Sequence, residues 1–359
     1  MRVARPGPDV RHWWRRPRGL LVGAGSLVVA VAIAVVVAFV VNGVGSQLPP
    51  RSALPQRITG QVPLPGDGSR FDYASVDPGR GLLFIAHLGA SEVIEVDLRA
   101  HRVVRTIPNL PQVHGVLVVP ALHRIYATAT GANQVVGLDE DTGAVVTRSP
   151  TGDYPDGLAF DQRRAAIWTT NETGGTETVI DAATGNGRGN VDLGGEVGNV
   201  VYDPAADQMW VAVQGRNDMA AIDPATLTVT HRIPLPGCDH PHGLTIDPGN
   251  RLGFVACDGN AALLTVDLTT GQTLGSSPVG PQPDVLAYDQ TTHRLYVAAE
   301  TGWVVILDLR DRQLIVVGSD HLADGAHVVA VDELTHRSYY PVPAGADGHP
   351  ALLEAEPLR

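Results

Sequence analysis

The order of apolar and polar residues repeats along most of the chain. A short unit, in which small and apolar residues lead into an Asp-Pro-like turn, recurs seven times at intervals of 42 to 44 residues. We use one position of this unit as the reference position of each repeat: Asp77, Val119, Asp161, Asp203, Asp247, Asp289 and Asp332. A period in the low forties is typical of propeller blades with four strands each. The pattern therefore predicts an all-β fold, a seven-bladed β-propeller of four-stranded blades.

An aromatic residue stands seven positions after every reference position. The series is Phe84, Tyr126, Trp168, Trp210, Phe254, Tyr296 and Tyr339. Aromatic residues make up only 5% of the chain, so chance does not explain seven matches. We expect each of them on a second strand, in the core between neighbouring blades.

The two ends of the repeat region predict how the ring closes. The seventh repeat begins near His327 and stops after its third strand, around Leu353. Residues 57–65 (RITGQVPLP) resemble the strand that precedes a repeat elsewhere in the chain, as in residues 232–236 (RIPLP). We therefore expect the N-terminal strand to complete the last blade and to remove an open sheet edge.

Each third strand is expected to end in an acidic residue and a tight turn. The series is Asp97, Asp139, Asp181, Asp223 and Asp267. An Asp side chain accepts a hydrogen bond from the backbone two residues further on, and Gly accepts a positive φ. These residues are predicted to cap turns.

The segment before the repeats is apolar and uncharged from Leu20 to Val41, and six Arg residues precede it. Twenty-two residues are long enough to cross a bilayer as a helix. Under the positive-inside rule the N-terminus stays in the cytoplasm and the repeats lie outside. The alternative is a cleaved signal peptide, but its apolar part is shorter and ends in a small-x-small site, which is not evident here.

This organisation predicts four parts. They are a basic cytoplasmic tail (1–19), a transmembrane helix (20–41), a Pro/Gly/Ser linker (42–56) and the propeller (57–359). The expected location is the cell membrane, with a single pass and the propeller outside. The formal net charge of −12 leaves no basic surface for nucleic acid. The acidic body attracts cations instead.

A polar ring is predicted at one mouth of the central channel. Five positions before the reference positions stand Asp72, His114, Asp156, Gly198, His242, Asp284 and His327. We expect the six polar members to form a ligand-binding ring, with His114, His242 and His327 as candidate ligands of a divalent metal ion (zinc, calcium or copper). The alternative is that they satisfy backbone groups at the starts of strands. If they bind metal, their imidazole nitrogens should lie within about 4–5 Å of one point.

The loops between second and third strands open on the same face. Residues in these loops that could touch a ligand are His87, Asn171, Glu172, Arg216, Asp258 and Glu300. Most loop residues are simply solvated. His123, His293 and His336 are expected on the opposite face.

The two cysteines, Cys238 and Cys257, fall on neighbouring antiparallel segments of one repeat. Outside the membrane oxidation is favourable, so we expect a disulfide between them. The alternative interpretation is a copper or zinc site built from Cys238, His240 and His242, which alternate along an extended stretch.

Two stretches resemble known repeat families. Residues 167–171 (IWTTN) and 178–185 (TVIDAATG) are similar to YVTN-repeat propellers, and residues 241–248 (PHGLTIDP) are similar to NHL-type repeats. The resemblance covers residues 57–358 and implies the propeller fold. It does not choose a function, because such propellers serve as binding scaffolds, lactonases, lyases and surface proteins.

Three functions therefore remain open. The first is a non-catalytic binding scaffold for an extracytoplasmic protein, glycan or small molecule. The second is a metal-dependent lyase or hydrolase with the ion at the channel mouth, and the third is a copper-handling or redox protein. No nucleotide-binding glycine loop, Gly-x-Ser-x-Gly elbow or His-Glu-x-x-His motif is present, so no catalytic residue is assigned.

Overall fold

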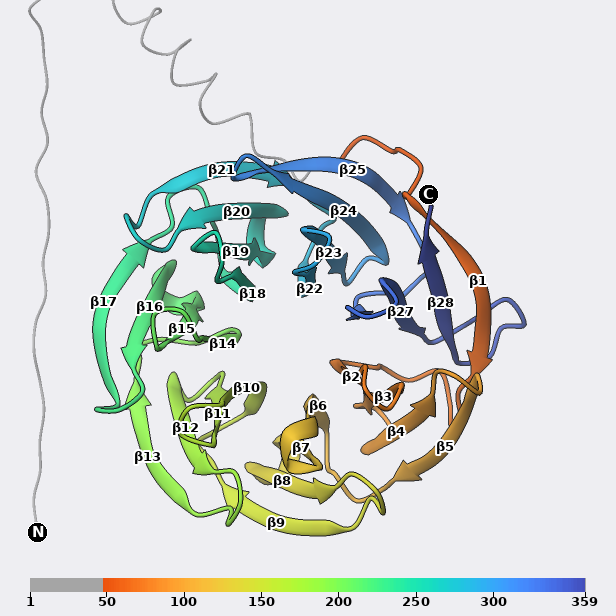
Figure 1. Ribbon diagram of the computed structural model, residues 1–359, viewed down its shortest axis with the longest axis horizontal. Coiled ribbons are helices and arrows are strands. Elements are labelled where there is room, and N and C mark those ends of the chain that lie inside the picture. The colour runs from red at the N-terminus through yellow and green to blue at the C-terminus, as the bar shows by residue number, and fades with distance from the viewer. Residues whose placement is uncertain (1–47, 359) are drawn as a thin grey trace, which may run out of the picture. The chain divides into compact units, whose positions relative to one another are not determined.

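A computed structural model describes residues 48–358, which form a closed ring of seven four-stranded antiparallel sheets around a central axis (Figure 1). The expected tail (1–19), the expected transmembrane helix (20–41) and the first part of the linker lie outside the described residues. Within residues 48–358, no helix has both the length and the apolar character needed to cross a bilayer.

The first four blades run in chain order from the innermost to the outermost strand. Blade 1 comprises β2 (Ala74–Asp77), β3 (Leu82–His87), β4 (Glu92–Asp97) and β5 (Arg102–Ile107); blade 2, β6 (Val113–Val119), β7 (Arg124–Ala129), β8 (Gln134–Asp139) and β9 (Val145–Pro150); blade 3, β10 (Pro155–Asp161), β11 (Ala166–Asn171), β12 (Thr176–Asp181) and β13 (Gly187–Asp192); blade 4, β14 (Val200–Asp203), β15 (Gln208–Val213), β16 (Asp218–Asp223) and β17 (Thr228–Pro234).

The last three blades complete the ring. Blade 5 comprises β18 (Pro241–Asp247), β19 (Leu252–Cys257), β20 (Ala262–Asp267) and β21 (Thr273–Pro278); blade 6, β22 (Pro283–Asp289), β23 (Arg294–Ala299), β24 (Trp303–Arg310) and β25 (Gln313–His321); blade 7, β26 (Ala330–Asp332), β27 (Arg337–Val342), β28 (Ala351–Pro357) and β1 (Gln56–Pro63). Four short 3-10 helices lie in loops of the described part of the chain: η1 (Pro120–Leu122), η2 (Thr130–Ala132), η3 (Gln214–Arg216) and η4 (Asp258–Asn260).

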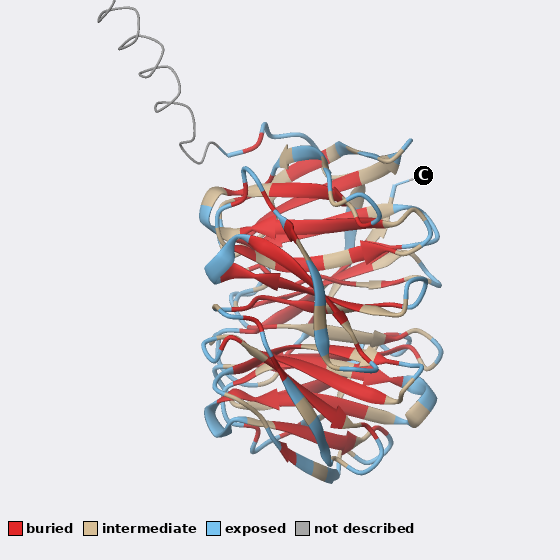
Figure 2. Cartoon of the chain, turned by 90° about the vertical axis from the view of Figure 1, so that its left-hand side faces the viewer, coloured by how far each residue is buried: buried red, intermediate tan, exposed pale blue. Residues whose placement is uncertain are grey.

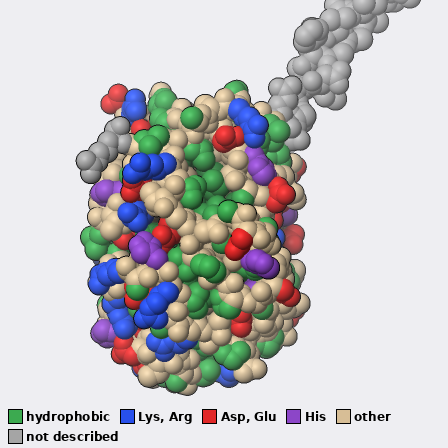
Figure 3. Space-filling view, turned by 90° about the vertical axis from the view of Figure 1, so that its right-hand side faces the viewer, with side chains coloured by type: hydrophobic (Ala, Val, Ile, Leu, Met, Phe, Trp, Pro, Cys, Tyr) green, Lys and Arg blue, Asp and Glu red, His purple; other side chains and the backbone are tan. Residues whose placement is uncertain are grey.

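Blade 7 takes its outermost strand from the other end of the domain, as predicted. Strand β1 pairs antiparallel with β28, from Gln56 opposite Pro357 to Pro63 opposite Ala351. Side chains reinforce the seam, because Arg57 Nε donates to Glu356 Oε1 at 2.9 Å. On the β1 side of the ring, basic, acidic and His side chains are interspersed on the surface (Figure 3).

The core lies within and between the sheets, where the strands are largely buried (Figure 2). All seven aromatic residues of the predicted series lie on the second strand of their blade, and each is at most 2% exposed. Tyr126, for example, packs in one cluster with Ile167 and Ile180 of the next blade. The expectation that these rings fill the core between blades is confirmed.

The turns also follow the predicted chemistry. The Oδ1 atom of Asp97 accepts hydrogen bonds from the backbone nitrogens of Arg99 and Ala100, both at 2.9 Å. Asp181 accepts from the nitrogen of Thr184 at 2.8 Å in the same way. These carboxylates hold the turns at the outer ends of the blades and take no part in the central channel.

Candidate functional site

The polar ring predicted from the repeats gathers at one end of the channel. Its members stand at the first residues of the innermost strands or just before them, and the innermost strands of successive blades contact one another around the ring. Five of the six polar members line a single cavity of about 440 Å³: Asp72, His114, Asp156, His242 and Asp284. The sixth, His327, is buried beside Asp72 and Asp284.

Glycines let the inner strands approach closely enough to bring this ring together. A Cβ atom on Gly115 would lie 2.2 Å from the carbonyl oxygen of Asp156, and one on Gly243 would lie 2.2 Å from that of Asp284. Gly198 occupies the one non-polar position of the ring, where a Cβ would lie 2.6 Å from the carbonyl oxygen of His242. Larger residues at these positions would force the blades apart at the mouth.

Two further sets of residues line the cavity, and apart from His240 the sequence pattern did not single out the first of them. This set stands two positions before the ring: Arg70, Gln112, Tyr154, His240 and Gln282. All but Arg70 adopt a positive φ, between 49° and 63°. Such backbone is uncommon for these residue types and often marks functional sites. The available signal was the repeat register itself, because these residues occupy one equivalent position of five repeats.

The second set comes from the loops after the second strands, eleven positions after the reference positions. It comprises Leu88, Glu172, Gln214, Asp258 and Glu300. Three of the predicted loop residues, Glu172, Asp258 and Glu300, are therefore at the cavity. His87 and Asn171 stand one position earlier and are fully buried in their blades. Arg216 does not line the cavity and pairs with Asp218 at 3.2 Å.

Two carboxylates and one imidazole converge on the inner side of the cavity. One donor atom from each of Asp72, Asp284 and His327 lies within 4.8 Å of the other two. The Nδ1 atom of His327 lies 3.1 Å from the carbonyl oxygen of Gly325 and donates to it. Its Nε2 atom is buried and has no hydrogen-bond partner among residues 48–358. An imidazole fixed through Nδ1 leaves the lone pair of Nε2 free to bind a metal ion.

The structure brings together a donor group different from the three imidazoles predicted as ligands. Within residues 48–358, Asp72, Asp284 and His327 form the one group of three potential metal ligands, and His114 and His242 do not belong to it. His114 has local partners of its own, although its Nε2 atom lies 3.9 Å from Asp72 Oδ2. Its Nδ1 atom is 2.9 Å from the carbonyl oxygen of Gln112, and its Nε2 atom is 3.1 Å from the hydroxyl of Tyr154. Carboxylates thus replace two of the three predicted His ligands.

Arg70 lies over the same carboxylates. Its Nη1 atom pairs with Glu300 at 2.5 Å, while Nη2 lies 3.5 Å from Asp284 and Nε lies 3.7 Å from Asp72. Burial, followed by the charges of Asp284 and Asp156, raises the pKa of Asp72 well above its usual value despite the guanidinium. The single positive charge of Arg70 therefore cannot neutralise all three of the carboxylates around it, which belong to Asp72, Asp284 and Glu300.

The surroundings of His242 favour the charged form of its imidazole. Its Nε2 atom lies 3.3 Å from Asp284 Oδ1, and its Nδ1 atom lies 2.7 Å from the side-chain amide of Gln214. Burial disfavours the charged form of the His242 ring and lowers its pKa. The hydrogen bond to Asp284 and the negative charges of Asp156 and Glu172 outweigh burial and raise its pKa to about 10. Burial likewise favours the neutral form of Asp284, but the hydrogen bond and charge of His242 hold its pKa below the usual value.

Asp156 faces the cavity from blade 3 without a hydrogen-bond partner for its Oδ1 atom among residues 48–358. The residue is only 3% exposed. Burial raises its pKa to about 7, even though His242 favours the ionised form. Burial also raises the pKa of the neighbouring Glu172, whose Oε1 atom accepts a long hydrogen bond of 3.4 Å from Gln214.

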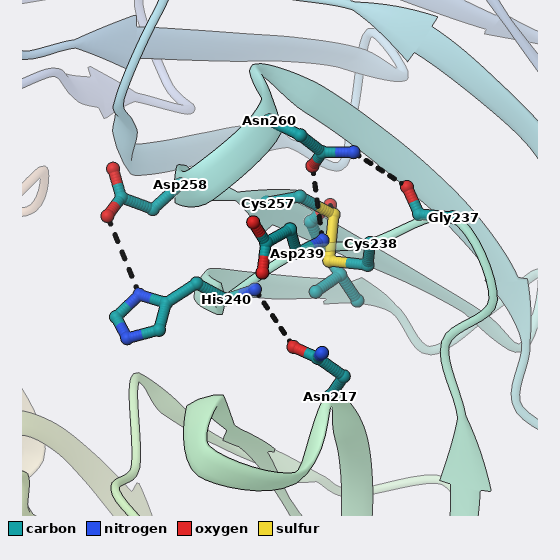
Figure 4. The surroundings of a disulfide bond; sticks show 9 residues. Asn217, Gly237, Cys238, Asp239, His240, Cys257, Asp258 and Asn260 are labelled. Carbon is teal, nitrogen blue, oxygen red and sulfur yellow. Dashed lines mark hydrogen bonds and ion pairs between the residues drawn. A yellow bond between two sulfur atoms is a disulfide. The ribbon is translucent and has the colours of Figure 1, made fainter. Parts of the chain in front are cut away.

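The predicted disulfide between Cys238 and Cys257 is present and joins the loop before β18 to the end of β19 (Figure 4). Beside it, the backbone nitrogen of His240 donates to Asn217 Oδ1 at 2.9 Å, and the imidazole lies 3.5 Å from Asp258. The bridge thus supports the cavity edge that carries His240. It also removes Cys238 as a thiolate ligand, so the alternative copper or zinc site on Cys238, His240 and His242 is wrong.

The position of Asp156 predicts a change of stability with pH. An unfolded Asp ionises near its ordinary pKa of about 3.9, whereas folded Asp156 ionises only near 7. Between these values the folded chain binds more protons, so its stability falls as pH rises. Asn cannot ionise. Asp156→Asn should therefore gain stability over the native chain between pH 5 and pH 8, of the order of 2 kcal/mol.

Thermal unfolding of the full-length chain at the two pH values measures this gain. Asp153→Asn is the matched control, because Asp153 is exposed in the same loop and does not line the cavity. If the stability difference between Asp156→Asn and the native chain is the same at pH 5 and pH 8, Asp156 is not a buried, protonated carboxyl group.

Comparison with known proteins supports the fold alone. No protein-family profile matches the chain, and no curated protein matches its sequence. Among solved structures, a streptogramin B lyase structure superposes with a TM-score of 0.68 at 14% identity, covering 83% of this chain and 96% of that one. A hydrazine synthase chain from Kuenenia stuttgartiensis superposes with a TM-score of 0.67 at 15% identity, and the match covers 84% of this chain and 96% of that one. The chain is thus a seven-bladed propeller similar in structure to that lyase.

Proposed function

We propose that this propeller binds a divalent metal ion through Asp72, Asp284 and His327 and holds a small polar ligand against that ion in the central cavity. One observation carries the proposal. The buried Nε2 atom of His327 lacks a partner among the described residues, and its ring belongs to a group whose donor atoms lie within 4.8 Å of one another. A buried polar atom without a partner calls for an explanation, and a metal ion supplies one.

The donor set favours zinc among the metals that the sequence suggested. One imidazole and two carboxylates match the nitrogen and oxygen ligands of catalytic zinc sites, which keep one position for water or substrate. Calcium takes six to eight oxygen ligands, and only two carboxylates converge here. The hydrogen bond from His327 Nδ1 to Gly325 is the kind of outer contact that orients a metal-binding imidazole.

The charge of the cavity supports a cation. Six carboxyl groups line it: Asp72, Asp156, Glu172, Asp258, Asp284 and Glu300. Arg70 is the one arginine among the described residues that line it. A divalent ion at Asp72 would take the place of the proton that burial favours there, and it would relieve the repulsion between Asp72 and Asp284.

Zinc binding by the purified full-length chain tests the site. The native chain should hold one Zn²⁺ per chain after dialysis, measured by elemental analysis, and His327→Ala should weaken the affinity at least tenfold, because one of three ligands is lost. Asp72→Asn, which keeps the side chain's shape, should do the same. Arg70→Ala should tighten binding, because it removes a competing positive charge from the same carboxylates.

His336→Ala is the matched control, since this His pairs with Asp289, away from the cavity. It should keep the zinc. Equal zinc contents in the native chain, His327→Ala and Asp72→Asn would rule the site out.

As a second candidate, this metal site would serve lyase or hydrolase chemistry. His242 favours it, because a protonated imidazole lies 3.3 Å from the proposed metal ligand Asp284 and can donate a proton to a leaving group. The metal, when bound, would polarise a carbonyl oxygen. The streptogramin B lyase structure has the same fold, and its 14% identity extends the likeness no further.

Zinc-loaded protein incubated with a panel of esters and lactones tests this candidate. His242→Gln should lower kcat at least a hundredfold, as expected for loss of a general acid, while the zinc content stays unchanged. Turnover that survives in His242→Gln would exclude His242 as the general acid.

The propeller works outside the cell, tethered by residues 20–41. The uncharged run of 22 residues with six preceding Arg residues supports this location. The disulfide Cys238–Cys257 supports it independently, because such bonds persist in oxidising compartments. The protein should remain in the membrane pellet after a carbonate wash, and protease added outside intact cells should degrade it. Protection of the propeller until the cells are lysed would contradict this orientation.

A further inference from the structure

The cavity has two ends with different chemistry. The proposed metal ligands come from three consecutive blades, with Asp284 on blade 6, His327 on blade 7 and Asp72 on blade 1. Across the axis, blade 3 supplies Asp156 from β10 and Glu172 from the loop after β11 (Figure 1). Arg70, the one arginine among the described lining residues, contacts carboxylates of the metal end.

The blade 3 end holds a carboxyl group that the fold itself does not use. Asp156 is 3% exposed, and its Oδ1 atom has no hydrogen-bond partner among residues 48–358. Its two neighbours in the ring lack no hydrogen bond of this kind, since the His114 side chain has three hydrogen-bond partners and Gly198 has no side chain. Buried polar groups are normally paired, so a carboxyl group that lines a cavity without a partner indicates a missing ligand group.

A second metal ion does not fit this end. Among residues 48–358, no third metal-binding donor joins Asp156 and Glu172 within the distance that a metal ion requires. An ammonium group fits better. It has three N–H donors spread around one positive charge, and it tolerates carboxylates that do not converge on a point.

Tyr154 adds a third acceptor at the same end. It stands two residues before Asp156 with φ at 63°, a strained conformation for an aromatic residue. Its hydroxyl lies 3.1 Å from His114 Nε2 and donates to it, which leaves the phenol oxygen able to accept a bond. Tyr154 is 37% exposed and lines the cavity, where a cation can also rest against the face of its ring.

We propose that the ligand of this cavity carries a protonated primary amine, whose ammonium group pairs with Asp156 and Glu172 beside Tyr154. The proposal rests on the function given above, in that it names the class of small ligand held in the same cavity. The amine end lies against blade 3, and the remainder of the ligand extends across the axis towards the metal end and Arg70.

Titration of the full-length chain with n-butylammonium, and with 1-butanol as its neutral analogue, tests the proposal. Calorimetry at pH 8 should show saturable binding of the ammonium ion and none of the alcohol. Asp156→Asn and Glu172→Gln should each weaken ammonium binding at least tenfold. Asp153→Asn, which removes the same charge from an exposed position of the same loop, should bind like the native chain.

The variants separate loss of the site from loss of the fold. Asp156→Asn is expected to be at least as stable as the native chain at pH 8, so weaker binding in this variant does not reflect unfolding. Zinc content is measured on the same samples. Normal zinc content without any preference for butylammonium over butanol would overturn the amine proposal and leave the metal site standing.

The reverse result also distinguishes the two proposals. Ammonium binding that depends on Asp156 and Glu172 in a chain that takes up no zinc would support the amine site and overturn the metal site. Ammonium binding that both substitutions leave unchanged would overturn the amine site.

Discussion

The pairing of β1 with β28 holds the rest of the structure in place. Without it, blade 7 would be a three-stranded sheet with an open edge. The chain passes from β1 directly to Asp72, while His327 belongs to blade 7. The group formed by Asp72, Asp284 and His327 therefore spans the seam where the two ends of the chain meet. Its geometry exists only while the ring is closed.

Regular repetition explains why so much of the fold follows from the sequence. Each blade needs a bulky residue at the same place on its second strand, so the aromatic series could be placed in the core before any coordinates were known. The same register places the polar ring at one mouth of the channel, because equivalent residues of a closed ring lie at equal height. The disulfide followed because its two segments belong to one blade.

Repetition does not determine where individual side chains point. His114 and His327 occupy equivalent positions, yet the hydroxyl of Tyr154 engages His114 Nε2, whereas His327 Nε2 has no such neighbour among the described residues. The residue that stands to His327 as Tyr154 stands to His114 is Arg70, two positions before the ring in the next blade. Its guanidinium pairs with Glu300 and lies near Asp284 and Asp72. The difference between a tyrosine and an arginine there leaves the His327 imidazole free for a metal ion, and a search for His and Asp alone does not weigh it.

Two carboxyl groups of the cavity run against the stability of the fold. Burial raises the pKa of Asp72 and of Asp156, so each ionised carboxylate costs folding free energy at neutral pH. Core packing of seven blades does not require these charges. Clusters of groups with perturbed pKa values in a cavity are typical of functional sites, where a ligand restores the balance.

The distribution of these charges implies a direction for whatever binds. Arg70 partly neutralises the carboxylates of blades 1 and 6, and His242 of blade 5 pairs with Asp284. Asp156 of blade 3 contacts neither cation directly. A ligand with one positive and one electron-rich end would therefore lower its energy most in a single orientation, with its positive end towards blade 3. A cavity inside a ring of like sheets becomes asymmetric through side chains alone, and that asymmetry provides the basis for selective binding in a fold whose backbone is nearly symmetric.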